Sequence, residues 1–291
     1  MRHPAFEGSI TVDDSKKIFS PATGLELLNR GVGRFLECIE SNESTPQTAP
    51  GLERLLPPED CANLEEDSWG RMGLTAFPNN TNGIPRRRVK ILAKNPGHSV
   101  IPALREALLK NKIEVLGLGA RALSAKHYNL ALRAGNNKAD VNWNVIAAQF
   151  KRLIKLARPG ECIHACIDRQ GGRKFYSGQI CELFSGAMPW VEVETQHASM
   201  YRIEVDGRIV RIVFLVNADG HTLLAALASM AAKLARELCM QRINAFFNSH
   251  APENTLRPTA GYFSDARRFL RETRGIRKKL GIANRDLVRL K

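Results

Sequence analysis

The stretch Glu161–Gly178 (ECIHACIDRQGGRKFYSG) decides the fold class, because it joins the pattern of a buried strand to a carboxylate, a glycine turn and two cations. Cys162–Ile167 is small or apolar without a helical period, which predicts a short central strand covered on both faces. Gly171 and Gly172 predict the turn that follows. Asp168 therefore stands at the strand end, either as a turn former or as a functional carboxylate.

Strand alternation places the side chains of Cys162, His164, Cys166 and Asp168 on one face. This spacing could be a row of zinc ligands, but the chain has no second Cys/His cluster at ligand spacing. The pattern therefore favours packing of small side chains over a zinc site.

The composition describes a globular chain of 291 residues with 44% hydrophobic residues. The sequence shows neither a secretory signal pattern nor an apolar run long enough to span a bilayer, so we expect a cytoplasmic protein with no membrane association. The six cysteines are scattered, which predicts reduced thiols.

The net charge of +14 is uneven along the chain. Residues 1–70 hold 13 acidic and 6 basic side chains, a balance of −7, so the remaining residues carry +21. Residues 257–291 contribute 11 basic against three acidic side chains. A positive surface of this size predicts a polyanionic partner, and nucleic acid is favoured over a membrane surface because no basic amphipathic helix with an aromatic face occurs.

Hydrophobic periodicity predicts alternating helices and strands, and hence an α/β fold with a mixed sheet and flanking helices. We expect a domain over residues 1–256, interrupted by a polar, partly disordered insertion at about 40–85, and a basic helical segment over 257–291. The expected helices cover 24–39, 100–110, 143–156, 176–184 and a long run from about 223. The expected strands cover 86–91, 112–118, 162–167, WVEVE at 190–194 and a hairpin turning at Asp206-Gly207.

A second carboxylate, Asp219, stands at a strand end directly before the long helix, where it could also be a helix-capping charge. Ser229, Lys233 and Arg236 follow at steps of three and four residues, so they share one face of that helix. Near the start of the chain, the segment Asp14–Lys17 (DSKK) enters the first helix as a loop, which is a place where a phosphate can bind.

The order of these features resembles the type-2 ribonuclease H family, in a longer and divergent bacterial branch. The resemblance covers nearly the whole chain. It rests on Asp14–Lys17, Tyr128-Asn129 with Gly135–Lys138, Asp168 with Gly171–Arg173, Asn217–Met240, and Gly261-Tyr262 with Asp265–Phe269.

The resemblance implies a ribonuclease H-like fold and metal-dependent endonuclease activity on the RNA strand of RNA–DNA hybrids, with Mg²⁺ or Mn²⁺ as cofactor. Two-metal phosphodiester hydrolysis needs several carboxylates. By the resemblance, Asp168 and Asp219 are metal ligands and Glu194 is a supporting catalytic acid. The implied nucleic-acid contacts are Ser15, Lys16, Lys17, Arg173, Ser229, Lys233 and Arg236.

One departure from the family is large. The Asp-Glu-Ala-Gly motif of its opening strand, which supplies the first carboxylates and a glycine turn, does not occur in this chain. We therefore expect a sheet without its opening strands, and either a sequence that continues upstream of Met1 or a reduced protein. Two functions stay open: an endonuclease, or a non-catalytic protein that binds hybrid or duplex on the same fold.

Overall fold

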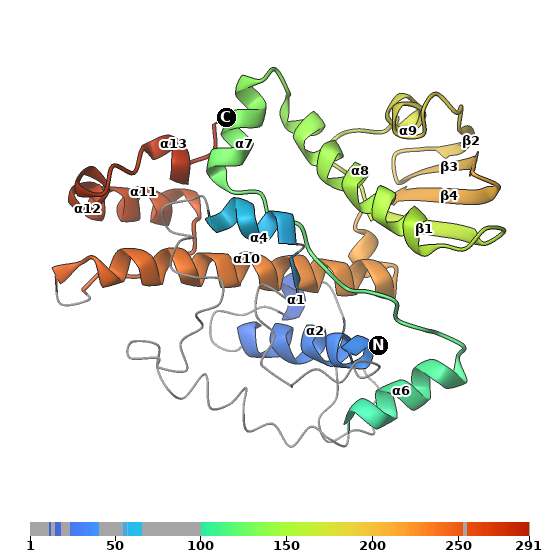
Figure 1. Ribbon diagram of the computed structural model, residues 1–291, viewed down its shortest axis with the longest axis horizontal. Helices are drawn as coiled ribbons and strands as arrows, with labels where there is room; N and C mark the ends of the chain where they lie inside the picture. Colours follow the sequence, from blue (N-terminus) through green and yellow to red (C-terminus); the bar gives the residue numbers. More distant parts are fainter. Residues whose placement is uncertain are drawn as a thin grey trace. The chain divides into compact units, whose positions relative to one another are not determined.

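The computed structural model describes residues 12, 15–18, 24–40, 55–56, 58–65, 100–252 and 255–290 (Figure 1). The chain forms two compact units, each with its own hydrophobic core. Unit 1 combines Met1–Asn129 with Leu227–Lys291, and unit 2 is Leu130–Ala226. The expected boundary near residue 256 falls inside unit 1, which includes the basic C-terminal helices.

Unit 2 is an α/β structure built on a four-stranded mixed sheet in the order β1-β4-β3-β2. Strand β1 is parallel to β4, while β3 is antiparallel to both β4 and β2. The strands are β1 (Cys162–Asp168), β2 (Trp190–Glu194), β3 (Ala198–Val205) and β4 (Arg208–Leu215). The predicted hairpin is confirmed, because Asp206 and Gly207 both have positive φ and join β3 to β4.

Two expectations for the strand at residues 162–167 are wrong. Strand β1 lies at the edge of the sheet, since it pairs with β4 alone among the described strands. It is also covered on one face: Ile163 is buried, whereas Cys162, His164 and Asp168 are exposed. The cysteines on the exposed face are small and apolar, so the sequence did not show the alternation of buried and exposed positions along this strand.

Helices α8 (Lys138–Leu156) and α9 (Ser177–Leu183) contribute to the core that covers the other face. The predicted helix at 143–156 begins five residues earlier, because the Asn137 side chain accepts hydrogen bonds from the backbone N–H groups of Ala139 and Asp140. Asp140 returns a bond to the Asn137 N–H, which completes a capping box.

Aromatic rings form the centre of the unit 2 core. The ring of Tyr176 stacks on Phe214 with centroids 3.6 Å apart, and Tyr201 meets Phe214 edge-on at 6.3 Å. Trp143 from α8 lies 6.5 Å from the same ring. Phe214 therefore joins β4 to both its neighbouring strand and the covering helices, and it is fully buried.

Unit 1 is helical in its described part. Its longest element is α10 (Leu223–Ser249), most of which belongs to this unit, and the prediction of a long helix from about residue 223 is confirmed. The core joins α10 to residues of α2, α4, α11 and the segment that follows α12. The other helices are α1 (Ser15–Ile18), α2 (Gly24–Glu40), α4 (Pro58–Glu65), α6 (Val100–Lys110), α7 (Ala125–Arg133), α11 (Phe263–Glu272), α12 (Arg274–Lys279) and α13 (Asn284–Leu287). The boundary between the units falls within α7.

Part of the expected polar insertion at 40–85 is folded. Leu55, Leu56 and Leu64 are buried in the unit 1 core, and Asp60 of α4 accepts two hydrogen bonds from the Arg121 guanidinium, at 2.8 and 2.7 Å. The rest of that insertion, and the expected strand at 86–91, lie mostly outside the described residues.

The expected strand at 112–118 is wrong. Residues 113–120 form no strand, and half of them are exposed. A strand needs a neighbour for its backbone groups, and among the described residues this segment makes one long-range backbone bond, from the Ala120 N–H to the Leu55 carbonyl at 2.7 Å. In the described part of the chain, no helix combines the length and apolar character required to cross a membrane.

Candidate functional site

The ends of the parallel strands β1 and β4 form a carboxylate corner in unit 2. Asp168 is in register with Leu215, and the Arg169 N–H donates to the Leu215 carbonyl at 2.7 Å. Asn217 then takes a left-handed conformation, φ 57° and ψ 47°, which turns the chain back toward β1. As a result the Ala218 N–H donates to Oδ1 of Asp168 at 2.9 Å.

Asp219 follows in the 3₁₀ turn η2 (Ala218–Gly220), directly before α10. The hydroxyl of Thr222, rather than Asp219, accepts from the Ala225 N–H in the first turn of α10. The structure therefore brings the segments of Asp168 and Asp219 together at one corner, although the two residues are far apart in sequence.

Arg169 fixes the position of this corner, whereas the sequence suggested that it would contact an anion brought to Asp168. Its guanidinium donates to the Gln196 and Thr195 carbonyls at 2.5 and 3.0 Å and to the Ser199 hydroxyl at 2.8 Å. Arg169 thus ties the end of β1 to the turn between β2 and β3. An Arg next to a strand-end Asp was the available signal, but its partners depend on the sheet order.

Glu194 is on the other face of the sheet from Asp168. Glu194 is in register with Ser199, and Ser199 and Tyr201 lie on one face of the sheet. Asp168, in register with Leu215, lies on the opposite face. Glu194 accepts a short hydrogen bond from the Tyr201 hydroxyl. Burial of the hydroxyl is the main cause, and the bond to Glu194 the second, of a pKa of Tyr201 raised to about 12.

The residues at the corner do not complete the donor set for a pair of divalent ions. Two ions held close together need several carboxylates. Among the residues that the structure describes, no group of three or more His, Cys, Asp and Glu side chains could hold a metal. Asp168 and Asp219 are thus the two carboxylates that the described residues of this corner offer.

The predicted nucleic-acid contacts fall into two groups. Arg173 belongs to unit 2, where its guanidinium lies 5.9 Å from the ring centroid of Tyr176. The others belong to unit 1. There, the Ser229 hydroxyl of α10 donates to the Ser15 hydroxyl of α1 at 2.9 Å, which joins two predicted residues 214 positions apart.

The segment Asp14–Lys17 is not a loop in its described part, because Ser15, Lys16 and Lys17 belong to the short helix α1. Ser15 is buried against Ser229, while Lys16 is exposed. Asp14 and the side chain of Lys17 lie outside what the structure describes.

Lys233 and Arg236 are engaged with protein groups. Both contact Oε1 of Glu237, at 3.1 and 2.6 Å respectively. Arg236 also donates to the Ala260 carbonyl at 2.5 Å and lies over the exposed ring of Tyr262, 4.9 Å from its centroid. These contacts hold the loop before α11 against α10.

Asn129 of the middle segment also has a structural role. Its side-chain amide donates to the carbonyls of Arg285 and Val288 at 2.6 and 2.8 Å and accepts from the Leu290 N–H at 2.7 Å. These three hydrogen bonds converge on one buried amide, which holds residues 285–290 against α7.

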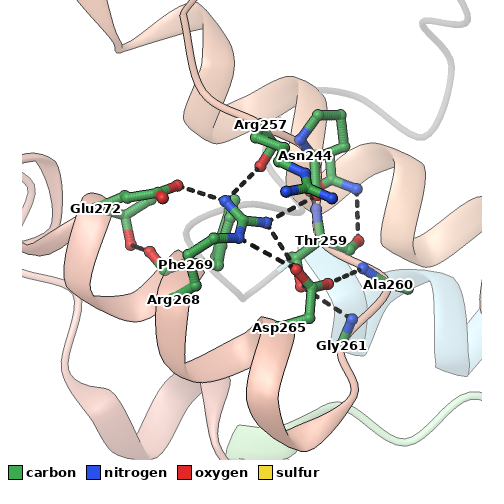
Figure 2. A network of polar contacts seen from close by, with 11 residues as sticks. Asn244, Arg257, Thr259, Ala260, Gly261, Asp265, Arg268, Phe269 and Glu272 are labelled. Atoms are coloured by element: carbon green, nitrogen blue, oxygen red, sulfur yellow. Dashed lines mark hydrogen bonds and ion pairs between the residues drawn. The ribbon is translucent and has the colours of Figure 1, made fainter.

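A polar network around Asp265 and Arg268 fixes the start of α11 (Figure 2). Asp265 accepts from Arg268, from the Thr259 hydroxyl and from the Ala260 N–H, each at 2.7 Å. The Arg268 bond makes the largest contribution to lowering the pKa of Asp265 from 3.8 to about 2, and the other two bonds add to it. Arg268 also donates to Glu272 and to the Arg257 and Pro258 carbonyls.

We expect this network to make the stability of unit 1 dependent on acid pH. Because the pKa of Asp265 is lower in the folded state, its contribution is complete above its unfolded value and is lost as the pH falls toward about 2. The free energy of unfolding of wild type should therefore drop between about pH 5 and pH 2 more than that of Asp265→Asn, as urea titrations can measure. Parallel curves for the two proteins would contradict this assignment.

The outer surface of α11 and α12 carries a cationic stripe: Phe263, Arg267, Arg271, Arg274 and Lys278. Steps of four residues place Phe263, Arg267 and Arg271 on one side of α11, and Arg274 and Lys278 on one side of α12; all five are exposed. Arg267 lies 4.3 Å from the centroid of the Phe263 ring, which is 67% exposed.

The stripe is not neutralised by nearby acids. Asp265 and Glu272 are bonded to Arg268, and Asp286 accepts from the Ala283 N–H. Within the described part of unit 1, Arg271, Arg274 and Lys278 form no ion pair. An exposed row of cations with an aromatic at one end is suited to contacts with phosphates.

A comparison of the chain with models of known protein families, with curated proteins and with solved structures finds no match.

Proposed function

We propose that this protein binds nucleic acid through the cationic stripe of α11 and α12, with RNA–DNA hybrid or duplex as the ligand. The observation that carries the proposal is the uncompensated charge of Arg271, Arg274 and Lys278, together with the exposed Phe263 ring that Arg267 contacts. Arginine and lysine side chains bind backbone phosphates and release counterions, so such a surface gives affinity without sequence preference.

The experiment compares the wild type with the triple variant Arg267→Gln/Arg271→Gln/Arg274→Gln. Fluorescence anisotropy of a labelled RNA–DNA hybrid is measured between about 50 and 200 mM salt. If each arginine contacts one phosphate, the slope of log affinity against log salt decreases by about 3, and the affinity at low salt falls about tenfold or more.

A matched control removes three cations from another exposed surface. Lys151, Arg152 and Lys155 are exposed on α8 of unit 2, and their replacement by glutamine lowers the net charge by the same amount. The proposal requires the control to keep the wild-type salt slope. Equal losses in both variants would show that net charge alone attracts the ligand and would refute a stripe-specific site.

A second candidate function is metal-dependent endonuclease activity on a ribonuclease H-like fold, with Mg²⁺ or Mn²⁺. The observation that favours it is the carboxylate corner, where the Ala218 N–H bonds Asp168 and Asp219 follows directly. Against it stands the incomplete donor set among the described residues.

Electrophoresis of the same hybrid after incubation with Mn²⁺ separates the two candidates. Intact RNA with retained, salt-dependent binding is the result expected of the binding protein. Cleavage of the RNA strand that is lost in Asp168→Asn would instead support the endonuclease.

A further inference from the structure

The face of the unit 2 sheet that α8 and α9 do not cover is a second candidate binding surface, chemically distinct from the cationic stripe. Strand alternation and register place every second residue of β1, β3 and β4 on this face. On β2 the face holds Trp190 and Val193, because a bulge between Val191 and Val193 shifts the alternation. Trp190 is 69% exposed, and His164 and Arg211 are also exposed. The face is therefore accessible at its centre and at its β2 edge.

Four polar or aromatic side chains form one row across all four strands. His164 of β1 is in register with Arg211 of β4, Arg211 with Arg202 of β3, and Arg202 with Trp190 of β2. Neighbouring strands lie about 4.8 Å apart, so the row extends over about 14 Å. We name these four residues the cross-strand row.

The cross-strand row is unfavourable for the isolated sheet. Arg202 and Arg211 are directly opposite each other, and like charges at opposed positions repel. Within the described residues neither arginine forms an ion pair, and Glu204, two residues from Arg202 on the same face, forms none either. An opposed pair of cations without an acidic partner suits a ligand that brings negative charge.

The aromatic end of the row identifies the chemistry of that ligand further. The Arg202 guanidinium lies 5.2 Å from the centroid of the Trp190 ring, so one side of the indole is in contact with a cation. The indole is still 69% exposed, which leaves room for a planar group to stack on it. A nucleotide has both the planar base and the phosphate that this combination binds.

We propose that the cross-strand row binds single-stranded nucleic acid, with a base stacked on Trp190 and phosphates on Arg202 and Arg211. The ligand is single-stranded because a base within a duplex is already stacked and cannot expose its face to an indole. Val193, Met200 and Val213 form the adjacent row and supply apolar surface beside the stacked base. This surface is additional to the stripe on α11 and α12, and its ligand differs from the hybrid bound there.

The experiment titrates the full chain with a labelled single-stranded RNA of mixed sequence and measures fluorescence anisotropy. Trp190→Ala is expected to weaken binding about 5- to 100-fold, because loss of one base stack has an effect of this size. Trp190→Phe should retain most of the affinity. Arg202→Gln and Arg211→Gln should each weaken binding and reduce its salt dependence, whereas Arg152→Gln on α8 should not.

Tryptophan fluorescence gives an independent readout of the stack. Of the three tryptophans, Trp143 is buried, so the part of the quenching that Trp190→Phe removes reports on Trp190. Quenching by single-stranded RNA that disappears in Trp190→Phe supports the proposal. Wild-type affinity in Trp190→Ala, or binding of anionic lipid vesicles or an acidic peptide at equal strength, overturns it.

The outcomes distinguish this proposal from the proposed function. The triple variant of α11 and α12 should lose hybrid binding and still show quenching of Trp190 by single-stranded RNA. Conversely, Trp190→Ala should bind the hybrid as the wild type does. If the proposed binding at one surface is refuted, binding at the other surface can therefore still be measured.

Discussion

Replacement of Phe214 by alanine should lower the free energy of unfolding of unit 2 by about 3–5 kcal/mol, the usual cost of removing a buried phenyl ring. The ring is fully buried, stacks on Tyr176 at 3.6 Å and meets Tyr201 edge-on. Its removal leaves a cavity between β4 and the layer of Trp143 and Tyr176, and these rigid rings cannot collapse into it. The near-ultraviolet circular dichroism signal and Trp143 fluorescence follow the loss during urea titration.

Two variants test whether the effect comes from the ring. Phe214→Leu keeps most of the volume and should cost less than Phe214→Ala. Ile209→Ala changes a residue of the same strand that is 42% exposed, so its cost should be smaller than that of Phe214→Ala. If Phe214→Ala is no more destabilising than Ile209→Ala, Phe214 is not the centre of this core.

Replacement of Arg121 by alanine should destabilise unit 1 by about 3–5 kcal/mol, because it leaves a buried carboxylate without its cation. The side chain of Asp60 is 2% exposed and accepts from Arg121 at 2.8 and 2.7 Å. In the variant, Asp60 would keep the hydrogen bond from the Ala122 N–H at 2.8 Å as its remaining donor among the described residues. Helix α4 should then detach from the core, and amide hydrogen exchange of residues 58–65 should increase.

The double variant Asp60→Leu/Arg121→Leu separates pairing from packing. Replacing both charges by apolar side chains removes the unpaired carboxylate, so we expect the double variant to be more stable than Arg121→Ala. An equally unstable double variant would mean that the shape of this contact, rather than the buried charge, holds α4 in place.

Several helices and the hairpin could be predicted because their signals are local. Periodic apolar residues predict α2 and α10, and Asp206-Gly207 has the residues that a tight hairpin turn requires. The edge position of β1 could not be predicted, because it depends on which strands pair. Helix α4 was missed because it is short and polar, and its attachment depends on Arg121, far away in sequence.

The candidate site was predictable to a similar extent. Two carboxylates that follow adjacent parallel strands are expected to meet, as the segments of Asp168 and Asp219 do. Glu194 illustrates the limit: strict alternation from Trp190 would place it on the face of Asp168, but a bulge between Val191 and Val193 moves it to the opposite face. The cross-strand row has no sequence signal, because only the register brings its four residues into line.

The contact of Asn129 with the end of the chain has a consequence for protein synthesis. The Asn129 side chain bonds the backbone of Leu290, 161 residues later, so a ribosome adding 5–20 residues per second reaches this partner roughly 10–30 s after it has passed Asn129. A longer delay applies to most of the apolar residues of α2 and α4, whose partners on α10 and α11 are translated late. The core of unit 2 lies within residues 143–214 and is complete earlier. The nascent chain thus carries an unfinished apolar surface from unit 1 while unit 2 is being made, and during this interval a chaperone would be most effective.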